Sequence, residues 1–219
     1  MKSFVILAVW FGTTMGMFAQ ENIEAAAQRE AAETKDVATH ALETFQQIGK
    51  QDNFKTLGFE SPDEMTGATI GEPVVVLMVE LEDLRGYQAG SDPNKLLKAI
   101  NKVIYTVSAK ERVRSSIVLQ KGKEGWKASD FGGGNFARLV SAAREQSAKT
   151  ANLPQNAFFV VQVPALNAYF LGFRGQGKLM LSSLADDPTM KLKAGEARPA
   201  EDVFGELVPF ARKYNGLPM

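Results

Sequence analysis

The apolar run Val74-Val75-Val76-Leu77-Met78-Val79 decides the fold that this sequence predicts. Six consecutive apolar residues, most of them β-branched, are typical of a strand covered on both faces. Leu81, Leu84 and Tyr87 follow with the spacing of one amphipathic helical turn. The sequence therefore predicts a central strand that leads into a short helix.

Further strands are expected on either side of a glycine-rich segment. Short apolar runs at 103–107, 112–120 and 126–129, separated by polar turns, predict a three-stranded antiparallel meander. Runs at 158–163, 168–173 and 178–182 predict a second set of strands, the last two joined by the hairpin loop Arg174-Gly175-Gln176-Gly177.

Helices are expected between and around these strands. Periodicity and capping signals place them at 21–47, after the pairs Ser61-Pro62 and Asp92-Pro93, at 136–146 with Asn135 as N-cap, and at 200–214 with a kink at Pro209. Residues 147–156 are expected to form a linker.

Two of these helices share the pattern FxxLVxxAR. Phe136, Leu139, Val140, Ala143 and Arg144 carry it first, and Phe204, Leu207, Val208, Ala211 and Arg212 repeat it. Either the chain contains two related strand-hairpin-helix halves, or each helix independently turns an apolar stripe to a core. Both interpretations give an α+β fold in which helices flank antiparallel sheet.

The N-terminus has the layout of a secretory signal peptide. Lys2 is followed by an uncharged stretch from Phe4 to Phe18, and Ala19 precedes Gln20-Glu21. The stretch is shorter than the roughly 20 apolar residues that cross a bilayer. We therefore expect cleavage after Ala19, a periplasmic or extracellular destination, and no stable membrane anchor in the mature protein.

The predicted organisation is a signal peptide at 1–19, an N-terminal helix at 20–55, and two α+β halves at 56–147 and 157–216 that pack as one domain. The N-terminal helix is mostly alanine and charge up to Glu33. This part is expected to be either a loosely docked terminus or a helix that binds a partner. The sequence leaves the oligomeric state open.

Composition excludes several kinds of chemistry. The chain has no cysteine and a single histidine, His40, so thiol catalysis, haem attachment and zinc sites built from cysteine or histidine are not expected. Its 25 basic and 25 acidic residues balance, which indicates no nucleic-acid partner. We expect no cofactor and no metal.

The candidate binding residues are Lys110, Arg112, Arg114 and Trp126. The three cations alternate along one predicted strand, so they should point to one face, with Trp126 on the adjoining strand. Such a face would suit an acidic glycan or an acidic protein partner. The alternative is a solvated sheet face with Trp126 in the core.

Two weaker candidates concern anions and carboxylates. Gly132-Gly133-Gly134 before a helix is typical either of an anion site or of a flexible turn. Asp186 or Asp187, paired with Asp130 or Glu196, would supply the two carboxylates that a hydrolase needs. Adjacent aspartates before a proline are also typical of a turn.

Several segments resemble a group of exported bacterial proteins of unknown function. They are GFESPDEM at 58–65, GEPVVV at 71–76, RVRSSIV at 112–118, GW at 125–126 and DFGG at 130–133. The resemblance implies the fold and export, and it implies no activity.

These observations favour an exported, non-enzymatic binding or interaction protein. Two alternatives stay open. One is a carboxylate-dependent extracellular hydrolase, and the other is a secreted chaperone or a module that resembles a protease inhibitor.

Overall fold

The computed structural model describes residues 23–49 and 53–216, so the expected signal peptide lies outside the described residues. Within these ranges, eight strands form one sheet in the order β4-β3-β2-β1-β5-β6-β7-β8. Neighbouring strands are antiparallel except β1 and β5, which are parallel. The strands are β1 (Thr69–Met78), β2 (Lys98–Ala109), β3 (Arg112–Gly122), β4 (Gly125–Gly132), β5 (Phe159–Val163), β6 (Ala168–Gly175), β7 (Lys178–Ser183) and β8 (Ala197–Pro199).

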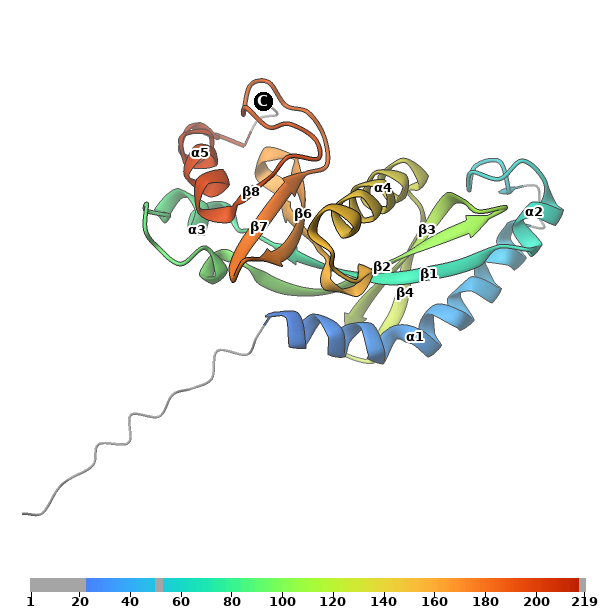
Figure 1. Cartoon of the computed structure of the whole chain (residues 1–219). Coiled ribbons are helices and arrows are strands. Elements are labelled where there is room, and N and C mark those ends of the chain that lie inside the picture. The colour runs from blue at the N-terminus through green and yellow to red at the C-terminus, as the bar shows by residue number, and fades with distance from the viewer. Residues whose placement is uncertain (1–22, 50–52, 217–219) are drawn as a thin grey trace, which may run out of the picture.

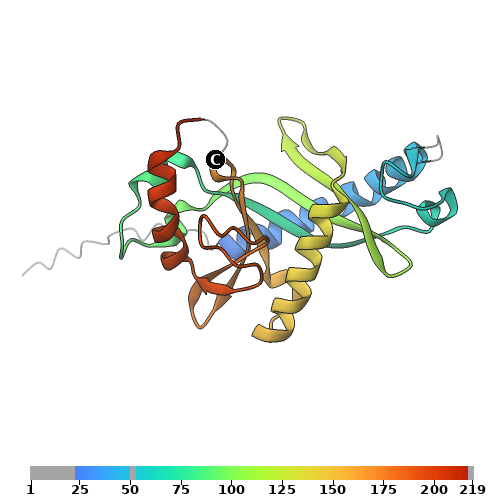
Figure 2. The ribbon, with the colours of Figure 1, turned by 90° about the horizontal axis from the view of Figure 1, so that it is seen from above.

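Helices cover both faces of this sheet, which confirms the α+β class. Figure 1 shows α1 and α4 on opposite sides of the strands, and in Figure 2 α4 lies in front of the sheet while α1 passes behind it. The helices are α1 (Ile23–Ile48), α2 (Pro62–Thr66), α3 (Leu81–Gly86), α4 (Gly134–Ala151) and α5 (Ala200–Lys213), with 3₁₀ turns η2 (Pro93–Leu96), η3 (Gln155–Ala157) and η4 (Pro164–Leu166).

The two halves of the chain share an order of strands and final helix, although α3 and η2 stand between β1 and β2 in the first half only. Four strands are followed by a helix in each half, β1 to β4 with α4 and β5 to β8 with α5. Because β1 and β5 are parallel neighbours, the second unit is turned over relative to the first. Val140 of α4 therefore packs on one face of the sheet, whereas Phe204 of α5 packs on the other.

The shared helix pattern nevertheless packs differently in the two halves. Leu207 of α5 is fully buried, but Leu139, the matching residue of α4, is 48% exposed. Arg144 of α4 is buried, whereas Arg212 of α5 is exposed. The shared pattern therefore occurs in the helix that follows the fourth strand of each half, but it does not determine which side chains of that helix face the core.

The central strand β1 is covered on both faces, as its sequence predicts. Val74 and Val76 belong to the core under α4. Val75 and Leu77 belong to the larger core, to which α1 contributes Phe45. β1 pairs with β5 over Val76–Met78, and the earlier residues of β1 have no strand partner on that side.

The start and the end of α4 differ from the prediction. Its N-cap is Gly133, in a left-handed conformation with φ 64°, and Asn135 lies inside the helix, where its side chain accepts a hydrogen bond from Arg138. A Cβ atom on Gly134 would lie 2.3 Å from the backbone oxygen of Arg114, so this close contact requires glycine. The helix continues to Ala151, so half of the expected linker is helical.

Two short elements also differ from the prediction. The helix expected after Asp92-Pro93 is only the 3₁₀ turn η2, and β2 already begins at Lys98. The sequence did not predict β8, because three residues are too few to show an alternating pattern. α5 is helical on both sides of Pro209, and the kink expected there stays a prediction.

Candidate functional site

The predicted cations lie at the hairpin between β2 and β3. Lys110 and Glu111 form the turn, both with positive φ, and Lys110 and Arg112 are exposed. Val107 pairs with Ser115 and Ser108 with Val113, so Arg114 is the extra residue of a β-bulge. A bulge changes which face its residues point to, so the alternation that suggested one basic face does not extend through Arg114.

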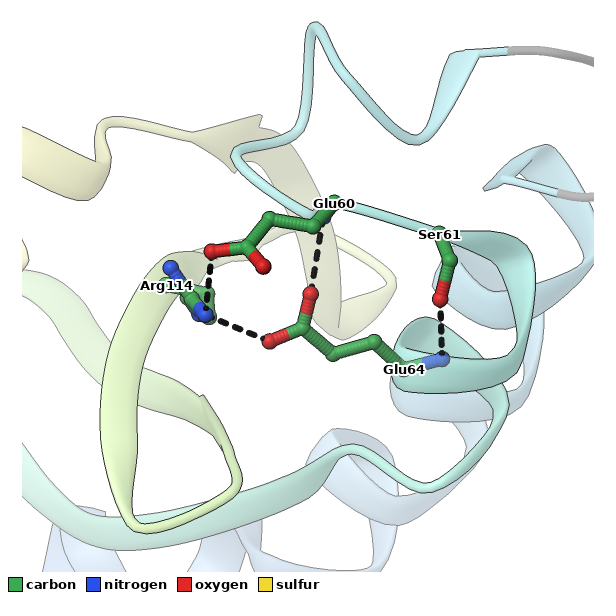
Figure 3. Close-up of polar contacts among 4 residues, drawn as sticks. All are labelled: Glu60, Ser61, Glu64 and Arg114. Carbon is green, nitrogen blue, oxygen red and sulfur yellow. Dashed lines mark hydrogen bonds and ion pairs between the residues drawn. The ribbon is translucent and has the colours of Figure 1, made fainter.

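Arg114 lies against two carboxylates at the start of α2 (Figure 3). Its Nη2 is 2.9 Å from Oε1 of Glu60 and 2.7 Å from Oε1 of Glu64. The backbone N–H of Glu60 donates to Oε2 of Glu64 at 2.7 Å, and the backbone N–H of Glu64 donates to Oγ of the N-cap Ser61 at 3.1 Å. The guanidinium is thus already paired with two anions of the same chain.

The Glu64 carboxylate has no solvent-accessible side-chain surface, and only 16% of the Arg114 side chain is exposed. The hydrogen bond from the backbone of Glu60, followed by the ion pair with Arg114, holds the pKa of Glu64 below its ordinary value. A Cβ atom on Gly58 would lie 2.5 Å from the backbone oxygen of Arg114. This cluster therefore joins segments 58–65 and 112–118 and fixes α2 to the bulge of β3.

Trp126 lies far from Arg114. It pairs across the sheet with Lys121, seven residues further along β3, which corresponds to roughly 23 Å of strand. Its indole N–H donates to Oε2 of Glu33 at 3.1 Å, and Nζ of Lys121 lies 2.8 Å from the same oxygen. These two hydrogen bonds, with Lys121 the stronger influence, lower the pKa of Glu33. Trp126 thus helps to hold α1 on the sheet, and its role in binding stays a prediction.

Of the expected hydrolase carboxylates, Asp186, Asp187 and Glu196 share one loop, whereas Asp130 lies in a distant part of the sheet. Oδ1 of Asp186 accepts the backbone N–H of Ala194 at 2.8 Å, and Oδ1 of Asp187 accepts that of Met190 at 2.9 Å. These bonds shape the loop between β7 and β8, where Glu196 is exposed. Asp130 is on β4, six strand positions from β7, or roughly 29 Å along the sheet.

A cleft lies between the N-terminal part of α1 and β1. We call it the α1 cleft, and its volume is about 620 Å³. Small side chains of α1, Ala31 and Ala32, leave the space open, and Tyr105 of β2 lies beneath it. Its lining residues are Gln28, Ala31, Ala32, Lys35, Ile70, Gly71, Glu72, Pro73, Val75, Tyr105, Asn156 and Phe158.

A second, smaller cavity of about 160 Å³ adjoins this cleft. Gln28, Asn156 and Phe158 line both spaces, so the two form one elongated depression. Phe159 and Arg174 line its far part. Most of these residues are far apart in the sequence, which is why periodicity and motif spacing gave no sign of the site.

The charges around this depression are few. Lys35 and Glu72 line the main cleft, and Lys35 has no ion pair within the described residues. Nη1 of Arg144 lies 3.4 Å from the backbone oxygen of Glu72 and 3.3 Å from that of Pro73, and Nη2 donates to Gln155. Arg144 is 5% exposed, and burial lowers its pKa. Its positive charge therefore lies directly behind the wall of the cleft.

Three further observations concern metal ligands, His40 and membrane-spanning helices. No group of three or more His, Cys, Asp or Glu side chains that could hold a metal occurs in residues 23–49 and 53–216. His40 is exposed on α1, where its Nδ1 contacts the backbone oxygen of Asp36. Among the described helices, none has the length and apolar character that crossing a membrane requires.

Comparisons with protein-family models, with curated proteins and with solved structures find no match for this chain.

Proposed function

We propose that this chain is an exported, non-enzymatic binding protein that holds a small ligand in the α1 cleft. The observation that carries the proposal is the cleft itself, because its volume of about 620 Å³ falls within the range of known small-molecule sites. Its composition supports the same conclusion. Apolar side chains such as Val75 and Phe158 line it together with a few polar groups, including Lys35 and Asn156.

The sequence of the N-terminus supports export, and it gives that part of the proposal its own test. N-terminal sequencing of the chain recovered from the exported fraction should begin at Gln20. A chain that stays in the cytoplasm with Met1 intact would contradict export while leaving ligand binding open.

The cleft can be tested with Nile red, a neutral dye that fluoresces in apolar surroundings. We expect saturable fluorescence with one dye per chain. Ala32→Trp should abolish it, because Ala32 is exposed and yet lines the cleft, so a large ring there fills the space without disturbing the core. The matched control is Ala142→Trp, at an exposed position of α4 on the other face of the sheet. Equal fluorescence from both variants would refute the α1 cleft as the binding site.

Lys110 and Arg112 are the two predicted cations that stay exposed, and neither has an ion pair among the described residues. An acidic glycan or an acidic protein partner is therefore proposed to contact this hairpin. Retention on a sulfated glycan column should fall when both residues are changed to alanine.

A further inference from the structure

We propose that the ligand of the α1 cleft is a single-chain anionic amphiphile, with its negative head group at Lys35 and its apolar chain along the floor of the cleft. This inference rests on the proposed function, since it names the class of ligand for the same site. It is argued from the shape of the depression and from the charges around it.

The shape favours an elongated ligand over a compact one. The main cleft and the smaller cavity share Gln28, Asn156 and Phe158, so a chain can pass from one into the other. Apolar side chains continue along this path, with Ile70 and Val75 at the main cleft and Phe159 beyond it. Val75 and Phe159 are almost fully buried, so a hydrocarbon chain would pack against them and remove mainly the surface of Ile70 from water. Such a chain has no polar group of its own to leave unpaired.

The charges favour an anion. The charged residues that line the two cavities are Lys35, Arg174 and Glu72, two cations against one anion. Arg174 donates to the side chain of Asn94 at 2.8 Å. Lys35 faces the main cleft without an ion pair inside the described part of the chain, so we assign the head group to Lys35.

Arg144, which lies behind the wall of the cleft, strengthens the preference for an anion. It is a buried cation whose hydrogen-bond acceptors are the uncharged backbone oxygens of Glu72 and Pro73 and the amide of Gln155. Buried charges are normally paired with an opposite charge. The carboxylate of Glu72 attracts Arg144 but does not offset the effect of its burial. A negative head group in the cleft would add to this attraction, whereas a cationic head group would be repelled.

The test compares three probes of equal chain length, dodecanoate, dodecyltrimethylammonium and dodecanol, all kept below the concentrations at which they form micelles. Binding is measured by calorimetry and by displacement of Nile red. We expect dodecanoate to bind about tenfold more tightly than the ammonium compound, the size of effect that opposite and like charges at a partly exposed site produce. Equal or tighter binding of the ammonium compound would overturn the inference.

Charge reversal at one residue sharpens the test. Lys35→Glu should weaken dodecanoate binding by about three- to tenfold and leave dodecanol binding unchanged. Lys123→Glu, at an exposed turn residue, makes the same change of net charge away from the cleft and should have no effect. Unchanged dodecanoate binding in Lys35→Glu would overturn the assignment of the head group.

The two proposals fail in different ways. If no probe and no dye binds, the α1 cleft is not a ligand site and both proposals fall. If Nile red and dodecanol bind in a manner that Ala32→Trp abolishes, but dodecanoate has no advantage over the ammonium compound, only the anionic class of the ligand is wrong.

Discussion

The two ends of α1 contact the sheet in opposite ways. Near its C-terminus the helix is held by Phe45, which is fully buried, with its ring centroid 5.7 Å from those of both Phe59 and Phe131. Towards its N-terminus, small side chains such as Ala31 and Ala32 line the cleft, and the contact with the sheet is polar, with Oγ1 of Thr34 2.9 Å from the hydroxyl of Tyr105. One helix therefore closes the core at one end and leaves a cleft at the other.

The largest effect should come from breaking the aromatic end. Phe45→Ala should lower the free energy of unfolding by about 3–5 kcal/mol, because it removes a buried ring and leaves a cavity. Urea unfolding measures this value. Ile48→Val, at a partly exposed position on the same helix, is the control and should cost about 1 kcal/mol or less. A loss for Phe45→Ala no larger than that of the control would contradict the anchoring role.

The buried carboxylate beside this end gives the second prediction. Glu64→Gln should lower the melting temperature at pH 7, because Arg114 then keeps only the exposed Glu60 as its partner. The pKa of Glu64 is lowered in the folded state, chiefly by the hydrogen bond from the backbone of Glu60. Its ionised form therefore stabilises the fold above the ordinary glutamate value of 4.5, and this contribution is lost as the pH falls through the lowered pKa.

The difference in melting temperature between the wild type and Glu64→Gln should thus be largest near neutral pH and close on acidification. Glu60→Gln is the matched control, because its side chain is 69% exposed and should matter little. A difference that stays constant from pH 7 to pH 3 would show that packing, and not the charge, holds Glu64 in place.

The smallest effect is expected at the other end of α1, with the opposite sign. Oε2 of Glu30 is buried without a hydrogen-bond partner in the described structure, and burial, the largest influence, raises the pKa of this residue. Its ionised form therefore destabilises the fold above the ordinary glutamate pKa. Glu30→Gln should raise the stability at pH 7 by less than about 1 kcal/mol, and the gain should vanish in acid.

Thermal unfolding from pH 7 to pH 3 checks this sign. Glu43→Gln, on the exposed side of the same helix, should leave the melting curve unchanged. A loss of stability in Glu30→Gln at neutral pH would mean that the carboxylate makes a favourable contact.

The sequence predicted those parts of the fold that depend on neighbouring residues. The helix expected at 21–47, the Ser61 cap and the strand cores all follow from local spacing, and each is present in the described residues. The start of α4 was predicted wrongly because it depends on the close contact between Gly134 and the backbone of Arg114, which is distant in the sequence. The parallel pairing of β1 with β5 depends in the same way on tertiary structure.

The candidate site was harder to predict than the fold. Arg114 and Glu64 each stood in a recognisable segment, but a bulge in β3 decides that they meet. The α1 cleft brings Gln28, Pro73 and Phe158 together from three separate parts of the chain, and none of them carries a chemical motif. Only the path of α1 across the sheet creates that space.

The hydrogen bonds of Arg144 bear on how the chain is made. Domains form from the N-terminus during synthesis, so the first four strands and α4 leave the ribosome before β5 is available. At that stage β1 would be an edge strand, and its unpaired backbone N–H and C=O groups would be open to pairing with a strand of another chain, which is a recognised cause of aggregation. Because the guanidinium of Arg144 belongs to α4 and engages the backbone oxygens of Glu72 and Pro73, it already covers the start of β1, whereas Val76–Met78 stay open until β5 pairs with them.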